Sequence, residues 1–234
     1  MSKHIYADRQ TDSLYKYLRH KHGQNNPRAN GYLFQSYFLY EQKILMSEVT
    51  NEHQIVVDIG CGSGLMIKPL TGQIKAAIGI DFNEIACVDA KSNDVPVVRG
   101  DAFMLPLADE SIDMVLNCQF LNQQTSQNTQ HLINELHRIL RKGGRCVLIW
   151  RNHSAMIHKI ALSLSSILDK LTGRPTFPYH DNTVDDVENF CKAAGFTRIV
   201  KKELVFPPIK WRTQNSDGLL GGLIGASCFI VADK

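Results

Sequence analysis

The sequence predicts an α/β fold built on a mostly parallel β-sheet, and three observations support this expectation. From Gln54 onward, short apolar runs alternate with helical stretches, which is the pattern of β-α units. The runs are continuously apolar, as expected of strands that helices cover on both faces. A chain of 234 residues with 44% hydrophobic and 21% charged residues has the composition of an ordinary globular protein with one large core.

Short apolar runs mark the candidate strands of the parallel part, at 55–59, 76–80, 95–98, 112–116 and 145–150. Before the last of these, apolar residues recur at helical spacing and predict a helix over 129–140 that ends at Gly143 and Gly144. The end of the chain predicts a helix over 181–195 and then two strands, 197–205 and 227–232, as an antiparallel pair. Together these runs predict seven strands.

The N-terminal residues 1–50 are predicted to form a helical cap, and residues 51–234 the main domain. Residues 8–48 lack strand-like alternation and are broken at 23–31, which indicates two helical pieces. Residues 154–180 interrupt the β-α rhythm and are interpreted as an insertion beside the active site. Six of the seven tyrosines lie in the first 40 residues. Packing of the cap explains most of them, and a few could line a pocket for a partly apolar or aromatic substrate.

The segment VVDIGCGSG, residues 56–64, is the central motif. Asp58 ends a strand, and Gly60, Gly62 and Gly64 follow it, where glycine lets the backbone turn sharply and approach a nucleotide-like ligand. The spacing is GxGxG, so it differs from the GxGxxG dinucleotide fingerprint, and no Gly-Lys-Ser/Thr of a P-loop follows. Pro69 then predicts that the next helix is short or kinked.

Two aspartates follow the next strands. Asp81 ends the second strand, where its carboxylate could accept hydrogen bonds from both hydroxyls of a ribose; alone, such an Asp is a cap or turn residue. Asp101 follows the third strand and could accept a hydrogen bond from an adenine amino group. A turn or N-cap role for Asp101 is an equal alternative.

These motifs, in this order, resemble the class I S-adenosylmethionine (SAM) dependent methyltransferases, with their Rossmann-like fold. The resemblance is strongest to the methyltransferase type 11 branch of ubiquinone and menaquinone methyltransferases and many small-molecule enzymes. It covers residues 55–150, from VVDIGCGSG through IGID and RGDAFMLPLADESIDMVLNCQFLNQ to ELHRILRKGGRCVLIW. It implies that the glycine loop holds the methionine part of SAM, that Asp81 holds the ribose, and that Asp101 meets the adenine.

The expected cofactor contacts on this resemblance are Asp58, Gly60, Cys61, Gly62, Gly64, Asp81, Phe82, Asp101, Ala102 and Asn117. The loop after the fourth strand reads Asn-Cys-Gln-Phe where methylases of exocyclic amines resemble Asn-Pro-Pro-Tyr, which disfavours that substrate class. Catechol-type enzymes hold magnesium with acids where this chain has Asn117 and Asn152. No metal is therefore expected, and S-adenosylhomocysteine (SAH) is the expected product.

His153, just beyond the fifth strand, is the candidate general base, and His131 is the reserve. A neutral imidazole at the carboxyl edge of the sheet could take a proton from an attacking hydroxyl or ammonium group. A solvated loop histidine is the alternative for His153. A nucleophile that is already reactive would need no base, because methyl transfer depends mainly on alignment and exclusion of water.

The expected function is methyl transfer to an O, N or C atom of a small molecule. The alternatives are a tRNA or protein methyltransferase, or a protein that binds SAM or SAH without catalysis. A net charge of +3 without a dense Lys/Arg run does not indicate nucleic acid. The six scattered cysteines are expected to be reduced thiols, and the polar N-terminus and the absence of a long apolar span predict a cytoplasmic protein without a membrane span.

Overall fold

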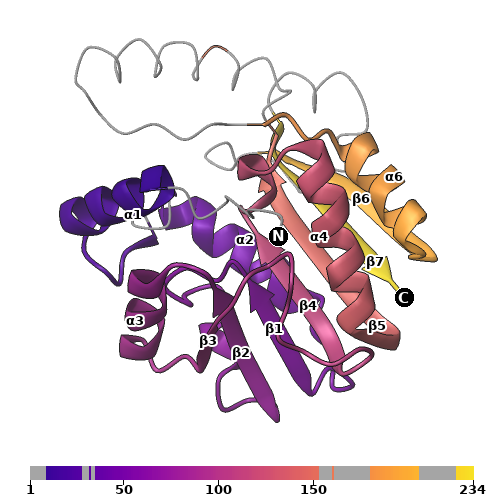
Figure 1. Cartoon of the computed structure of the whole chain (residues 1–234), viewed down its shortest axis with the longest axis horizontal. Helices are drawn as coiled ribbons and strands as arrows, with labels where there is room; N and C mark the ends of the chain where they lie inside the picture. Colours follow the sequence, from indigo (N-terminus) through magenta and orange to yellow (C-terminus); the bar gives the residue numbers. More distant parts are fainter. Residues whose placement is uncertain (1–8, 28–31, 33–34, 153–159, 161–179, 206–224) are drawn as a thin grey trace, which may run out of the picture.

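A computed structural model describes residues 9–27, 32, 35–152, 160, 180–205 and 225–234. Seven strands form one sheet in the order β3-β2-β1-β4-β5-β7-β6 (Figure 1). The strands are β1 Ile55–Ile59, β2 Ala76–Asp81, β3 Val97–Arg99, β4 Ile112–Cys118, β5 Leu140–Arg151, β6 Arg198–Val205 and β7 Gly225–Asp233. The first five pair in parallel, and β7 pairs antiparallel with both β5 and β6. The predicted sheet and its final antiparallel pair are confirmed.

Helices cover both faces of this sheet, as predicted. The helices are α1 Arg9–His22, α2 Gln35–Ser47, α3 Glu84–Ser92, α4 Ser126–Ile139 and α6 Val184–Ala194. Val57 and Ile59 of β1 point into a buried cluster that includes apolar residues of α4 and α6, whereas Val56 points into a second cluster with residues of α2 and α3. This alternation follows from the period of two along a strand.

Local sequence signals explain where several helices begin and end. Thr183 forms a capping box with Asp186 at the start of α6, and Gly195 ends that helix with a φ of 105°. Asn83 caps α3 by accepting from two backbone N–H groups. Between β1 and β2, Pro69 lies in the three-residue 3₁₀ helix η2, Lys68–Leu70, so the expected short helix is confirmed.

The predicted helix stop at Gly143 and Gly144 is wrong. Helix α4 ends at Ile139, and Leu140 already has an extended backbone and belongs to β5. The pairing of β4 with β5 shifts between Ile112 and Met114, and Gly143 has a φ of 72° in this irregular stretch. A Cβ on Gly144 would lie 2.8 Å from the Arg141 carbonyl oxygen, so the two glycines serve a bulge inside the strand.

Helix α2 packs on the sheet itself. Leu45 is fully buried and Phe38 nearly so, in the same cluster as the sheet residues Met114 and Phe229. Its apolar contacts therefore join the predicted cap to the main core, and the boundary at residue 50 stays a prediction.

Helix α1 is tied to α3 by polar contacts. Arg19 Nε donates to both oxygens of the fully buried Asp89 side chain, at 3.0 and 2.7 Å, and Tyr15 Oη donates to it at 3.0 Å. The predicted insertion at 154–180 lies outside the described residues except for its positions 160 and 180. All six cysteines are free thiols, as predicted.

Candidate functional site

The turn after β1 requires glycine at three alternate positions. Gly60, Gly62 and Gly64 have φ values of 74°, 55° and 74°, a region that residues with a Cβ rarely adopt. A Cβ on Gly60 would lie 2.8 Å from Cδ2 of Phe120. The amides of residues 60 and 61 both donate to the Ile80 carbonyl, at 2.8 and 3.2 Å, which ties the turn to β2. The glycines therefore allow the sharp turn, and at Gly60 the missing Cβ leaves room for the Phe120 ring.

Asp81 lies directly beside this turn, at the end of β2. Its Oδ2 accepts from Gly62 N and its Oδ1 accepts from Asn83 N, both at 2.8 Å. The carboxylate thus holds one amide of the glycine turn and the amide of Asn83, which caps α3.

Asp58 is the most unusual acid of the site. The side chain is buried, and neither carboxylate oxygen has a hydrogen-bond partner among the described residues. Burial, and then the nearby charge of Asp81, raise the pKa of Asp58 to about 7. Buried polar atoms are normally hydrogen-bonded, so this carboxyl group can take a donor that the described residues do not supply.

The other predicted contacts surround the same turn in different ways. Asn117 is buried on β4, where its Nδ2 donates to the Ile59 carbonyl at 2.7 Å. The Sγ of Cys61 lies behind the turn, 2.5 Å from the position a Cβ would take on Gly79. Phe82 is 47% exposed, and its ring centroid lies 5.6 Å from the Arg99 guanidinium.

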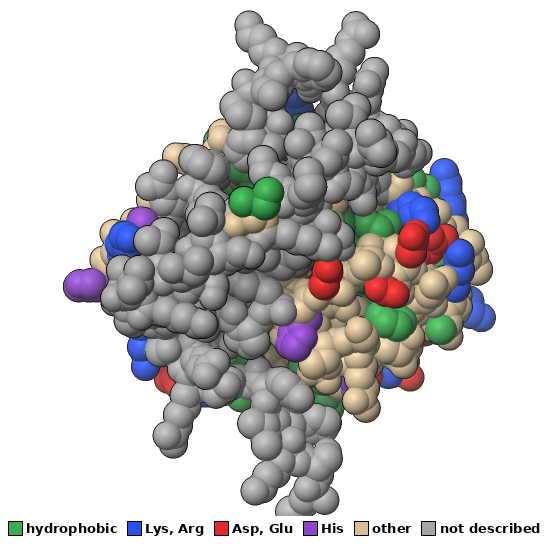
Figure 2. All heavy atoms as spheres, turned by 90° about the horizontal axis from the view of Figure 1, so that it is seen from above, with side chains coloured by type: hydrophobic (Ala, Val, Ile, Leu, Met, Phe, Trp, Pro, Cys, Tyr) green, Lys and Arg blue, Asp and Glu red, His purple; other side chains and the backbone are tan. Residues whose placement is uncertain are grey.

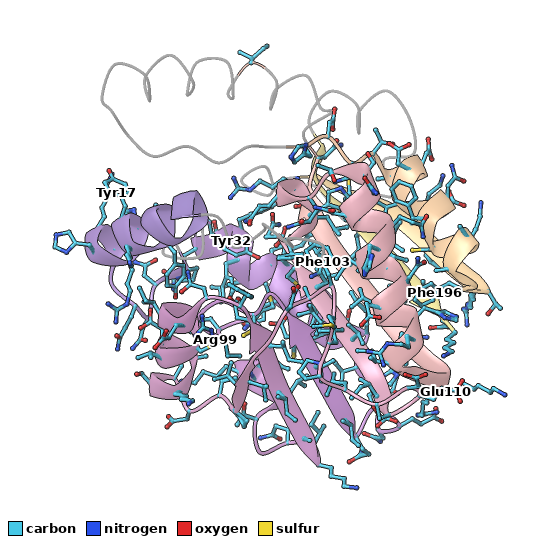
Figure 3. All side chains as sticks on the ribbon, in the orientation of Figure 1. Tyr17, Tyr32, Arg99, Phe103, Glu110 and Phe196 are labelled. Atoms are coloured by element: carbon cyan, nitrogen blue, oxygen red, sulfur yellow. The ribbon has the colours of Figure 1, made fainter. Side chains whose placement is uncertain are left out.

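Asp101 is involved in a turn, the alternative considered for it from the sequence. Its Oδ1 accepts from Phe103 N at 2.9 Å, and Ala102 packs at the edge of the core cluster. Phe103 lies close to Phe120, with ring centroids 6.4 Å apart. In Figure 3, Phe103 and Tyr32 both lie toward the upper, carboxyl ends of the central strands.

Of the two candidate bases, only His131 is described. Its Nε2 lies 2.9 Å from the Phe103 carbonyl oxygen, so this nitrogen carries a proton and Nδ1 is left as the acceptor. Because Phe103 packs beside Phe120, which covers Gly60, His131 is two side chains away from the glycine turn. His153 lies outside the described residues.

Sequence reasoning missed Phe120 and Glu41. Phe120 covers Gly60, and Glu41 of α2 binds Gln119, the residue before it. The only available signal for Phe120 was its place in the loop after β4. The signal for Glu41 was a lone acid among the apolar residues of a helix.

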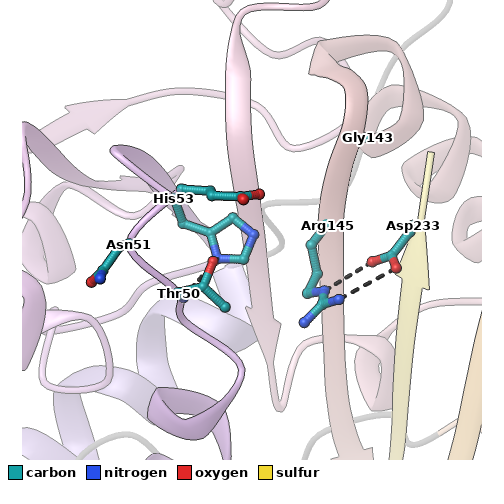
Figure 4. Close-up of a pocket in the computed structure, with 7 residues that line it drawn as sticks. Thr50, Asn51, His53, Gly143, Arg145 and Asp233 are labelled. Atoms are coloured by element: carbon teal, nitrogen blue, oxygen red, sulfur yellow. Dashed lines mark hydrogen bonds and ion pairs between the residues drawn. The ribbon is translucent and has the colours of Figure 1, made fainter.

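A surface hollow of about 380 Å³ lies elsewhere, at the opposite edge of the sheet (Figure 4). It is lined by Thr50, Asn51, Glu52, His53, Gly143, Arg145 and Asp233. The Arg145 guanidinium in it already pairs with Asp233 at 2.8 Å and with Glu48 at 3.2 Å. The carboxyl edge, where ligands bind in open parallel sheets, therefore remains the candidate site.

Comparison with known proteins agrees with this geometry. Residues 57–148, from within β1 to within β5, match the family model described as a methyltransferase domain. This segment of the chain is a methyltransferase domain by that match, and the chain is similar to SAM-dependent methyltransferases. The matched segment contains all ten predicted cofactor contacts, so the sequence motifs and the family model coincide.

Two relatives illustrate the family. A ubiquinone biosynthesis O-methyltransferase of Ruegeria pomeroyi is 24% identical over 69% of this chain and 67% of its own length. A probable S-adenosylmethionine-dependent methyltransferase of Mycolicibacterium smegmatis is 33% identical over 38% of this chain and 35% of its own length. The second match thus spans about a third of that relative.

Solved structures show the same fold. A Thermotoga maritima SAM-dependent methyltransferase, described as a possible histamine N-methyltransferase, aligns with a TM-score of 0.64 at 23% identity, over 85% of this chain and 89% of that one. The magnesium protoporphyrin IX methyltransferase of Synechocystis, solved with bound SAH, aligns with a TM-score of 0.62 at 17% identity, over 98% and 96%.

The residues of the methyltransferase site fit SAM. Asp58, which has no hydrogen-bond partner among the described residues, and the Asp81 carboxylate beside the glycine turn offer acceptors to a ligand rich in donors. Within the described ranges, no group of three His, Cys, Asp or Glu side chains could hold a metal ion, and the expectation that no metal is needed stays a prediction. None of the described helices is long and apolar enough to cross a membrane.

Proposed function

We propose that this methyltransferase transfers the methyl group of SAM to a small, partly apolar or aromatic acceptor. The observation that carries the proposal is the pair of aromatic side chains at the glycine turn. Phe120 covers Gly60, and Phe103 lies beside Phe120 and contacts His131 edge-on. Aromatic walls with few polar groups are typical of small-molecule sites. The similarity to an enzyme of ubiquinone biosynthesis supports an acceptor of this kind.

The chain's own residues would act by binding and alignment. Bound SAM supplies an electrophilic methyl group. The glycine turn and Asp58 would hold its methionine part, Asp81 its ribose and Asp101 its adenine. Phe120 would exclude water from the acceptor side and orient the acceptor for in-line attack.

A tRNA acceptor receives less support from the surface. The side chains described on the face in Figure 2 include acidic and basic groups next to one another on the side of α6. Lys201 there pairs with Asp185 and Glu188, both at 2.6 Å. A lysine that already pairs with carboxylates is poorly suited to bind a phosphate backbone, because phosphates bind unpaired basic groups.

A labelled-methyl assay tests the proposal directly. The protein and methyl-labelled SAM are incubated in separate reactions with a metabolite extract, with tRNA or with a protein extract. The label transferred in each reaction is then counted. We expect label in the metabolite fraction. Label in tRNA or protein would contradict the small-molecule assignment, and SAM binding without transfer to any fraction would support the non-catalytic alternative.

We further propose His153 as general base, with His131 in reserve, for an acceptor that must lose a proton. His153→Asn should then lower kcat by about 10²–10⁴-fold while SAM affinity stays the same, because a base acts only in the chemical step. It should also remove the acid limb that a histidine base gives the rate profile at about pH 6–7. His131→Asn tests the reserve candidate in the same way, and His53→Asn, at the opposite edge of the sheet, is the matched control. Near wild-type kcat in both candidate variants would show that neither His153 nor His131 is the base.

A further inference from the structure

The middle of α2 carries a carboxylate with no exposed surface, Glu41. Its oxygens accept hydrogen bonds from Tyr32 Oη at 2.8 Å and Ser227 Oγ at 2.6 Å. Gln119 Nε2 donates to both oxygens, at 2.9 and 3.0 Å. The donors are neutral, and no described basic side chain forms an ion pair with Glu41. Three segments far apart in the sequence therefore meet at one buried charge.

Gln119 is the turn residue that follows β4. It has a φ of 59°, a conformation uncommon for a residue with a side chain. Its N–H donates to the Ile149 carbonyl at 2.7 Å, which fixes the backbone at the end of β5. A backbone in this region persists where surrounding contacts hold it, and the Glu41 carboxylate is the side-chain contact that holds Gln119.

Phe120 connects the Gln119 turn to the cofactor site. Phe120 follows Gln119 directly, and its ring lies against Gly60, where an added Cβ would come within 2.8 Å of Cδ2. A shift of the Gln119 turn would therefore move the ring that covers the first glycine of the loop. The contacts form one path from Glu41 through Gln119 and Phe120 to Gly60.

Burial of α2 alone does not explain this polar cluster. Leu45 and Phe38 already bury the helix in the apolar core on that face of the sheet. Burial of a charge is costly, and it is offset here only by donors that converge from other segments. Burial raises the pKa of Glu41, and the hydrogen bonds from Ser227, Gln119, Tyr32 and Tyr37 oppose that rise.

We propose that Glu41 is a positioning residue: its carboxylate holds the Gln119 turn, so that Phe120 stays against Gly60 and the glycine turn keeps the conformation that binds SAM and SAH. This inference rests on one part of the proposed function, namely that SAM and SAH bind at the glycine turn. In this way α2 would influence the cofactor site through Gln119 and Phe120.

Two measurements on the full chain test the proposal. The first is hydrogen exchange of the Gln119 amide in the free protein, and the second is SAH affinity by calorimetry. Glu41→Gln keeps the size of the side chain and removes the charge, so the Gln119 amide should exchange faster, and SAH should bind about tenfold more weakly, within the usual range of coupling between sites. Amides of α4 should keep their protection. Glu48→Gln, a carboxylate just after α2 that pairs with Arg145, is the matched control and should change neither quantity.

A reversed pair separates positioning from general loss of stability. Gln119→Glu alone places two carboxylates together and should weaken SAH binding, whereas the double variant with Glu41→Gln restores a donor and an acceptor and should bind SAH more tightly than either single variant. If Glu41→Gln fails to fold, Gln119→Ala removes the same contact from the loop side and should give the same loss of affinity.

The outcomes distinguish this inference from the proposed function. Unchanged exchange at the Gln119 amide in Glu41→Gln, or faster exchange with unchanged SAH affinity, would overturn the positioning role. A wild-type protein that binds no SAH would instead overturn the cofactor assignment, and the exchange data would still decide whether Glu41 holds the turn. SAH binding without methyl transfer would leave the positioning role intact and contradict only the catalytic proposal.

Discussion

Asp81→Ala should weaken SAM binding by about 1.5–3 kcal/mol for each charge-assisted hydrogen bond lost, so loss of both ribose contacts would lower the affinity by at least about a hundredfold. The structure adds a second reason for a large effect. Asp81 also accepts from the amides of Gly62 and Asn83. Its removal therefore takes away a hydrogen bond of the glycine turn and one at the start of α3. Calorimetric titration of SAM into the variant measures the loss.

Two variants control this experiment. Asp81→Asn keeps the shape of the side chain and loses its charge, so its affinity should lie between those of the wild type and Asp81→Ala. Glu84→Ala removes an exposed carboxylate from the first turn of the adjacent α3 and should leave the affinity unchanged. Unchanged SAM affinity in Asp81→Ala, or tight binding of NAD by the wild type, would contradict the assignment of Asp81.

Asp58→Asn should make the ligand-free protein more stable than the wild type at pH 8, and this gain should be smaller at pH 5. The pKa of Asp58 in the folded protein is about 7, above the ordinary value of 3.8, because burial and the charge of Asp81 disfavour ionisation. The folded state then binds more protons than the unfolded state between these two values, so the stability contributed by Asp58 is lost progressively as the pH rises from 3.8 to about 7. The whole pKa difference corresponds to at most about 4 kcal/mol, of which a part is already lost at pH 5, and an uncharged Asn would not lose it.

Urea unfolding of the wild type and Asp58→Asn at pH 5 and pH 8 measures this difference. The two proteins should be closer in stability at pH 5, and the variant should be the more stable at pH 8. Asp113→Asn is a contrasting control, because hydrogen bonds from Arg141 and two backbone amides lower the pKa of Asp113. A wild-type protein whose stability relative to Asp58→Asn is the same at both pH values would show that Asp58 does not carry the buried charge.

The prediction of the fold from sequence was accurate where local chemistry decides the structure. Continuous apolar runs marked all five parallel strands, and Pro69 limited the helix after the glycine turn to three residues. The prediction was wrong at Gly143 and Gly144. Apolar residues at helical spacing followed by two glycines are typical of a helix end. Pairing with β4 extends β5 back to Leu140 instead, and this partner strand is distant in sequence.

The sequence by itself determined the SAM-binding motif, since the GxGxG turn and the acid at the end of β2 depend on backbone conformation and strand order, both written in local residue types. The tertiary structure alone decided which groups reinforce that motif. Glu41 and Gln119 are separated by 78 positions, and only the packing of α2 on the sheet brings them into contact. The unpartnered state of Asp58 likewise follows from burial among the described residues, which no local pattern shows. Hydrogen bonds and charges act over a few ångströms in space, so their partners are set by the fold.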